Sequence, residues 1–152
     1  MKIISHRGNI IGPVPEKENR PSYVDIAIQL GYDVEVDLRY FDGHFWLGHD
    51  KCQYKISYEW MVLRKNKIWF HCKDQESVIK LLDFDIQFQF FCHTSDDFVL
   101  TSTGHVWVHD LTKKINNKCI IPLLSMDDIK SYKITDEFGV CTDYVKYLKN
   151  EI

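Results

Sequence analysis

The sequence predicts an α/β fold, specifically a reduced or distorted TIM-like (β/α) barrel with hairpin insertions. Short apolar runs alternate with segments of helical periodicity along the chain, which is typical of a mainly parallel sheet with helices outside it. The chain has 152 residues, whereas a closed eight-stranded α/β barrel usually needs about 250. We therefore expect hairpins and bare loops to replace some of the helices.

The amino-terminal segment reads as a strand, a loop and a helix. Residues 2–6 form a short apolar run, and a loop rich in glycine and proline leads to Asn19 and Pro21, which are typical of a helix start. We expect Asn19 to cap this helix rather than to contact a ligand. Four apolar residues at helical spacing predict the buried face, and a glycine predicts the stop: Tyr23, Ile26, Ala27, Leu30 and Gly31.

The second predicted strand begins a β-hairpin. Residues 33–40 alternate polar and apolar side chains, Asp42-Gly43 favours a tight turn, and residues 44–48 run back. Strands and helices then continue to alternate. The remaining expected elements are helices at about 58–64 and after Asp74, strands at 68–72, 86–92, 119–124 and 139–142, a hairpin within 98–109, and a helical turn capped by Ser125 and Asp128.

The composition favours one domain covering residues 1–152. Apolar residues make up 45% of the chain, and the net charge of −3 comes from interspersed acids and bases. There is no basic face of the kind that nucleic acid or an anionic membrane requires. Because the sequence also has no apolar stretch of about 18 residues and no signal-peptide pattern, we expect a soluble, cytoplasmic protein without integral membrane contact.

The five cysteines are odd in number, widely spaced and never form a CxxC pair. This pattern indicates neither a disulfide framework nor a cysteine zinc site. We expect reduced structural thiols.

Four polar clusters occupy the first fifty residues, and several of them interrupt or end apolar runs. They are His6-Arg7-Gly8, Glu18-Asn19, Glu35-Val36-Asp37 and His49-Asp50. The carboxyl ends of strands are where α/β barrels place active-site groups. These clusters therefore predict a functional site.

Two carboxylates share one face of the strand at 33–38, because Glu35 and Asp37 are two residues apart. Like charges held this close favour a divalent cation with oxygen ligands, although a half-exposed polar strand face would show the same pattern. His71 and Lys73 share a face of the strand at 68–73 in the same way. If the two strands are neighbours, His71 completes the metal ligands and Lys73 faces an anion beside the ion.

The ordered elements HR, EN, ExD and HD resemble the signature of the glycerophosphodiester phosphodiesterase family, which has relatives among the sphingomyelinase D-like and phosphatidylinositol-phospholipase-like barrels. The resemblance covers residues 3–50 and 68–73, and Thr142-Asp143 is similar to the family's closing TD element. It implies that His6 and His49 act as general acid and base. It also implies that Glu35 and Asp37 bind one divalent metal ion, usually Mg²⁺ or Ca²⁺.

At the position of the family's third metal ligand, a glutamate in an ExK element, this chain has His71-Cys72-Lys73. Imidazole suits Mn²⁺, Fe²⁺ or Zn²⁺ better than Mg²⁺ or Ca²⁺, so Mn²⁺ or Zn²⁺ is an alternative for this chain. The short length also leaves little room for the family's substrate-shaping loops. We therefore expect a small or shallow substrate site.

The implied chemistry is cleavage of a phosphodiester. The metal, Arg7 and Lys73 would bind the anionic phosphate, while the two histidines transfer protons. Glu18 is expected to hold the Arg7 guanidinium in a bidentate pair, and Asp50 either orients His49 or begins a turn. Hydrolysis to open products and transfer that stops at a cyclic phosphate both fit.

The sequence thus favours a metal-dependent phosphoric diester hydrolase acting on a small glycerophosphodiester-like substrate. The alternative is a non-catalytic module that binds a phosphorylated sugar or lipid headgroup, because the chain is short and His71 replaces a carboxylate. Of the other polar and aromatic residues, His93 follows a strand and is a secondary site candidate. Trp107 is expected in the core, although its hairpin could lie near the mouth of the site, and His109 fits no spacing for a second metal.

Overall fold

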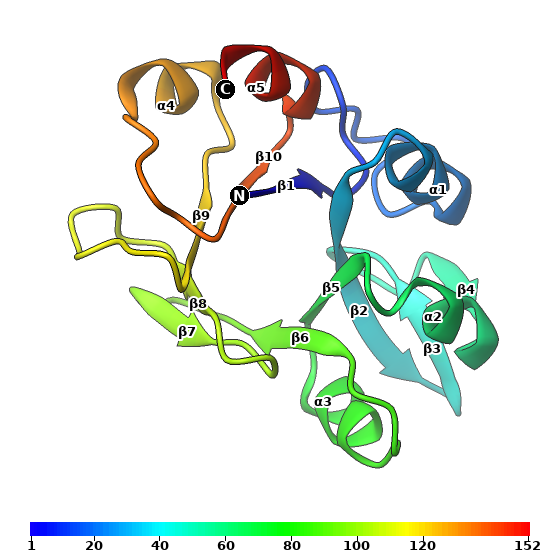
Figure 1. Ribbon diagram of the computed structural model, residues 1–152. Helices are drawn as coiled ribbons and strands as arrows, with labels where there is room; N and C mark the ends of the chain where they lie inside the picture. Colours follow the sequence, from blue (N-terminus) through cyan, green and yellow to red (C-terminus); the bar gives the residue numbers. More distant parts are fainter.

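The computed structural model describes all residues, 1–152, and its seven parallel strands curl around a common centre (Figure 1). Along the sheet these strands run in the order β6-β5-β2-β1-β10-β9-β8. This arrangement confirms the predicted distorted barrel. The bounds of the strands are β1 Lys2–His6, β2 Asp33–Phe41, β5 Ile68–Cys72, β6 Gln89–Cys92, β8 Val106–Val108, β9 Cys119–Pro122 and β10 Gly139–Thr142.

Three further strands are antiparallel and form the hairpin insertions. β3 (His44–Leu47) returns along β2, β4 (Tyr54–Ile56) pairs with β3, and β7 (Phe98–Leu100) pairs with β8. Asp42 and Gly43 both have positive φ, as the predicted two-residue turn between β2 and β3 requires. β4 was not predicted, because three residues are too few to show an alternating pattern.

Five helices lie outside the ring of strands (Figure 1). They are α1 Pro21–Gln29, α2 Tyr58–Arg64, α3 Gln75–Leu82, α4 Met126–Ser131 and α5 Val145–Glu151. The β7 hairpin stands between β6 and β8, and a loop without a helix joins β8 to β9. The prediction that hairpins and bare loops replace helices is therefore confirmed. So is the capping box of Ser125 and Asp128 at α4.

The predicted buried face of α1 was wrong in part. Val24 and Ala27 are the buried residues of this helix, whereas Ile26 and Leu30 are exposed. Apolar residues surround most of this short helix, so its periodicity allows more than one inward face. Packing against β2 selects the face that carries Val24.

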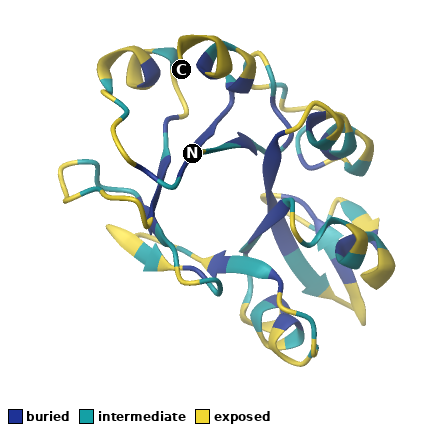
Figure 2. Ribbon diagram, viewed as in Figure 1, coloured by how far each residue is buried: buried dark blue, intermediate teal, exposed yellow.

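The alternation of β2 separates two environments. Val34, Val36 and Leu38 belong to the largest hydrophobic cluster, which packs between the sheet and the helices. Glu35 and Asp37 point the other way, into the barrel, and are buried as well. β2 is accordingly coloured as buried over most of its length in Figure 2. A separate cluster fills the barrel interior with Ile4, Trp69, Phe91, Trp107, Ile120 and Cys141.

The barrel has one seam without a strand ladder, between β6 and β8. Ser102, in the turn between β7 and β8, bridges this seam by accepting a hydrogen bond from the Phe90 amide (2.8 Å) and donating one to the Phe88 carbonyl (2.7 Å). Inside the barrel, the rings of Phe91 and Trp107 stack across the same seam with centroids 4.3 Å apart. The Ser102 amide also donates a backbone hydrogen bond to the Phe90 carbonyl (2.8 Å). These side chains and this backbone bond therefore close the barrel where a strand ladder is absent.

All five cysteines are free thiols, as their odd number and spacing predicted. The longest helix, α1, has nine residues. No helix is long and apolar enough to cross a membrane.

We expect Ser102→Ala to lower the free energy of unfolding by about 1–3 kcal/mol, because it leaves the Phe90 amide and Phe88 carbonyl without their hydrogen-bond partner at the seam. Urea denaturation of the purified protein measures this change. The matched control is Ser95→Ala at an exposed loop position, which should stay within about 0.5 kcal/mol of the original protein. Equal loss of stability in both variants would contradict the bridging role of Ser102.

Candidate active site

The carboxyl ends of β1, β2 and β5 meet at one end of the barrel. His6 is in register with Glu35, and Asp37 is in register with His71. β2 and β5 are therefore neighbours, which is the condition under which His71 was expected to lie beside Glu35 and Asp37. As a result, single ligand atoms of Glu35, Asp37 and His71 all lie within 4.8 Å of one another.

The geometry of these three residues fits a divalent cation. Glu35 and Asp37 are 3% and 0% exposed, and His71 Nδ1 lies 3.4 Å from Glu35 Oε1 and 3.6 Å from Asp37 Oδ1. Two buried oxygens, Glu35 Oε2 and Asp37 Oδ1, have no hydrogen-bond partner. Buried unpaired carboxylate oxygens are costly unless a cation compensates them.

The orientation of His71 fits a metal ligand. Its Nε2 lies 3.4 Å from the His93 carbonyl oxygen, and its ring stacks on Phe91 with centroids 4.8 Å apart. A proton on Nε2 that is donated to this carbonyl leaves the lone pair of Nδ1 directed at the carboxylates. Such contacts on the far nitrogen are typical of histidines that bind metals.

His6 stands between the carboxylates and Asp143, which follows β10. His6 Nδ1 lies 2.8 Å from Asp143 Oδ1, while Nε2 lies 3.9 Å from Glu35 Oε2. Burial alone would lower the pKa of His6, but the hydrogen bond to Asp143 and the charge of Glu35 outweigh burial and raise the pKa above 6.5. The contact with Asp143 directs Nε2 toward the carboxylate cluster.

Arg7 has a positive φ of 54° and links two of the motifs. Its Nε lies 2.8 Å from Asp37 Oδ2, and its Nη1 lies 3.1 Å from Glu18 Oε2. The expected bidentate pair with Glu18 was therefore wrong, because the guanidinium is shared between two carboxylates. The second oxygen of Glu18 accepts a hydrogen bond from Asn9, which also donates to Asp143.

The prediction that Asn19 caps α1 was also wrong. Arg20 is the cap residue and forms no capping hydrogen bond, whereas Asn19 donates to Asp37 Oδ2 and accepts from the Asp37 amide, both at 2.9 Å. Its backbone has φ of 62°, a conformation that asparagine tolerates better than most residues. In this conformation the Asn19 side chain reaches Asp37 on β2 instead of the amino-terminal end of α1.

His49 lies on the loop after β3, and its side chain is 44% exposed. The preceding position, 48, requires glycine, because a Cβ there would lie 2.0 Å from the Lys51 carbonyl oxygen. Arg39 donates hydrogen bonds to the carbonyls of Gly48 and His49. Asp50 Oδ1 lies 2.8 Å from His49 Nδ1, so the orienting role is the one that the structure favours.

A cavity of about 460 Å³ connects the two motif histidines. Its wall includes His6, Glu18, Asn19, His49 and Asp143. Lys73 lies nearby at the end of β5 and forms no ion pair shorter than 3.9 Å, the distance between its Nζ and Asp37 Oδ1. Lys73 therefore lies farther from its carboxylate partner than Arg7 does.

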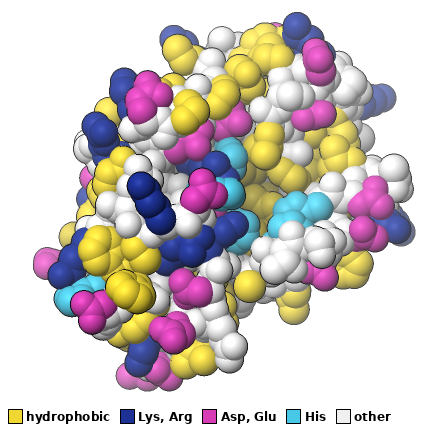
Figure 3. Space-filling model, turned by 180° about the vertical axis from the view of Figure 1, so that it is seen from behind, with side chains coloured by type: hydrophobic (Ala, Val, Ile, Leu, Met, Phe, Trp, Pro, Cys, Tyr) yellow, Lys and Arg dark blue, Asp and Glu magenta, His cyan; other side chains and the backbone are white.

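A second cavity, of about 190 Å³, opens beside the carboxylates and has aromatic residues on its other side. It is lined by His6, Glu35 and His71, and by Phe91, Trp107 and His109. Seen from behind, the molecule shows a hollow with hydrophobic side chains inside and histidines at its border (Figure 3). The sequence prediction did not include His109. It could have been found from the period of two that places it on the same face as Trp107.

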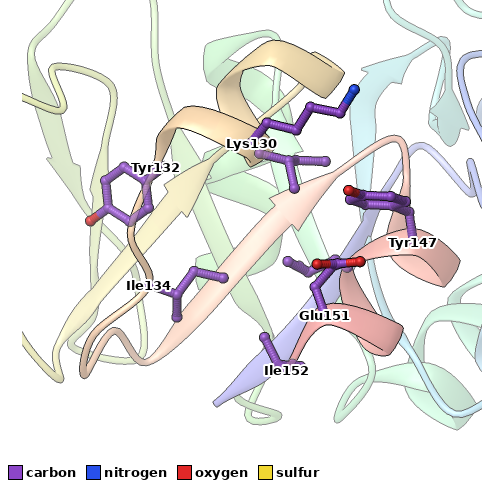
Figure 4. A pocket seen from close by; sticks show the side chains of 8 residues that line it. Lys130, Tyr132, Ile134, Tyr147, Glu151 and Ile152 are labelled. Atoms are coloured by element: carbon purple, nitrogen blue, oxygen red, sulfur yellow. The ribbon is translucent and has the colours of Figure 1, made fainter.

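A third cavity, of about 440 Å³, lies between α4 and α5 on the outside of the barrel (Figure 4). Its residues come from the two helices and the segment after α4, including Tyr132, Ile134 and Tyr147. It shares no residue with the two cavities described above and is not part of the candidate site.

The chain is similar in fold to the crystal structure of a glycerophosphodiester phosphodiesterase from Agrobacterium tumefaciens str. C58, with a TM-score of 0.55 and 12% sequence identity over 99% of each chain. At this identity the likeness shows the fold alone. No family model matches the sequence, and no curated protein matches it.

We expect Asp143→Asn to lower the pKa of His6, because the variant removes the negative charge beside Nδ1. Nuclear magnetic resonance titration of the histidine ring measures this pKa. Since the folded pKa lies above 6.5, protonated His6 stabilises the original protein below pH 6.5, and this contribution disappears as the pH rises through the folded value. The Asp50→Asn variant, which affects the contact to His49, is the control, and an unchanged His6 pKa in Asp143→Asn would contradict the role of Asp143.

Proposed function

We propose that this chain is a metal-dependent phosphodiesterase that cleaves a small glycerophosphodiester-like molecule. The observation that carries this proposal is the convergence of Glu35, Asp37 and His71 on one point, with the His6 ring beside them. The fold likeness to a glycerophosphodiester phosphodiesterase supports it. The proposal applies to the whole chain acting as one domain.

Glu35, Asp37 and His71 would hold one divalent ion, which when bound would neutralise the non-bridging oxygens of the phosphate. Mg²⁺ and Ca²⁺ prefer oxygen ligands, whereas an imidazole ligand favours Mn²⁺ or Zn²⁺. We therefore propose Mn²⁺ as the first ion to test. Asn19 and Arg7 hold Asp37 in place by a hydrogen bond and an ion pair.

Positive side chains would bind the anionic substrate beside this point. Arg7 is already shared between Asp37 and Glu18, so its main contribution is to position these carboxylates. Lys73 has no close ion pair and is the cation more available to a phosphate oxygen. Fixed positive charge in a partly buried site stabilises the charge that develops during phosphoryl chemistry.

The two motif histidines would divide the proton transfers. One removes the proton from the attacking hydroxyl of water or of the substrate itself, and the other protonates the leaving alkoxide. Each has a carboxylate on Nδ1, Asp143 for His6 and Asp50 for His49. In this arrangement Nε2 would be the reacting nitrogen of each ring; that of His6 lies toward Glu35, and both residues line the same cavity.

We expect His6→Ala and His49→Ala each to lower kcat by about 10²–10⁴-fold, the usual contribution of a general acid or base. Phosphorus magnetic resonance with a glycerophosphodiester and Mn²⁺ follows the reaction and separates open from cyclic products. His44→Ala is the matched control, because His44 is exposed at the start of β3 and contacts only its own turn. Unchanged turnover in both site variants would refute the proton-transfer roles, and binding without turnover in the original protein would favour the non-catalytic module.

We expect the original protein to bind one Mn²⁺ in calorimetric titration and Glu35→Gln to bind it at least about tenfold more weakly, since the variant removes one charged ligand. Glu59→Gln, at an exposed position on α2, is the control and should bind normally. His71→Glu should raise the affinity for Mg²⁺ relative to Mn²⁺, because it restores an all-oxygen ligand set. An unaltered Mn²⁺ affinity in Glu35→Gln would place the metal elsewhere.

A further inference from the structure

The barrel mouth has two chemically different sides. The ends of β1, β2 and β5 supply the charged and metal-ligating groups described above. The opposite side of the 190 Å³ cavity is apolar and comes from β6, β8, β9 with its following loop, and β10; its residues are Phe91, Trp107, Pro122, Leu124 and Cys141. The hollow in Figure 3 shows the same division between hydrophobic side chains and charged ones at its border.

The aromatic part of this wall is held in place by stacking. Phe91 lies between His71 and Trp107, with centroids 4.8 Å and 4.3 Å away and nearly parallel planes. Phe91 and Trp107 are both buried. These rings also pack across the seam between β6 and β8, so the packing of the barrel holds them in place at this wall.

The apolar side carries no ionised group. Its neighbouring imidazole, His109, stacks on His93 with centroids 3.4 Å apart, and burial together with the nearby histidines lowers the pKa of His109 to about 4. Burial raises the pKa of Cys141, so this side chain stays an uncharged thiol. A charged substituent would find no partner on this side of the cavity.

We propose that this apolar wall binds an uncharged, compact apolar substituent on the phosphate, the size of a phenyl or short branched alkyl group. The inference rests on the proposed function, because it assigns the second alcohol of the same diester. The cavity of about 190 Å³ is smaller than the roughly 300–1,000 Å³ of a typical small-molecule site, which favours a single ring over a long acyl chain. Burial of apolar surface next to the phosphate supplies the selectivity.

Calorimetric binding of phenyl phosphate and glycerol 3-phosphate, with and without Mn²⁺, tests this assignment. We expect phenyl phosphate to bind at least about tenfold more tightly. Leu124 is 39% exposed, so it can be changed without emptying the core. Leu124→Asn and the cavity-filling Leu124→Trp should each reduce the preference several-fold, whereas Leu63→Asn, at a 74% exposed position on α2, should not.

Equal affinity for the two phosphates, preference for glycerol 3-phosphate, or absence of binding by both would overturn the inference. A preference that persists unchanged in both Leu124 variants would also overturn it. Turnover of a glycerophosphodiester is measured separately on the same protein. Turnover without a phenyl preference refutes only the apolar subsite, whereas a phenyl preference without cleavage of any diester refutes the phosphodiesterase and leaves the subsite in place.

Discussion

The two buried carboxylates on the inner face of β2 are the constraint on which the rest of the site depends. Glu35 and Asp37 project side by side into the barrel, where neither has access to bulk water. Removing such charges from water costs several kcal/mol each unless positive charge and hydrogen bonds compensate. Arg7, Asn19 and His71 are therefore partners of β2. The first two polar clusters supply Arg7 and Asn19, and the neighbouring strand β5 supplies His71.

The half of the barrel that contains these compensating contacts keeps its outer helices. α1, α2 and α3 cover β2 and β5 from outside and form the largest hydrophobic cluster with them. On the other half, the β7 hairpin and a bare loop replace two helices. There the Ser102 bridge and the stacked rings of Phe91 and Trp107 hold the seam together. The same rings form the apolar wall of the mouth, so closure of the barrel and the shape of the proposed subsite have one cause.

The sequence predicted the parts of the site that depend on the period of a strand. Residues two apart share a face whatever the strand packs against, so Glu35 with Asp37 and His71 with Lys73 could be paired before any contact was known. The periodicity of α1 was less informative, since the short helix is apolar on most sides. The partners of Asn19 and Asp143 could not be predicted, because each contact crosses between segments far apart in the chain.

By itself, then, the sequence determined the alternation of strands and helices, the hairpin turn at Asp42-Gly43, the face of each strand that carries polar residues, and the absence of disulfide spacing. These features are local and follow from backbone geometry within a few residues. Only the tertiary structure decided which strands are neighbours at the seam and that aromatic rings line half of the mouth. It also decided that Asn19 binds Asp37 instead of capping α1, and that Asp143 holds His6. These features depend on strand order and register, which arise from the packing of the whole barrel and leave no pattern within any single segment.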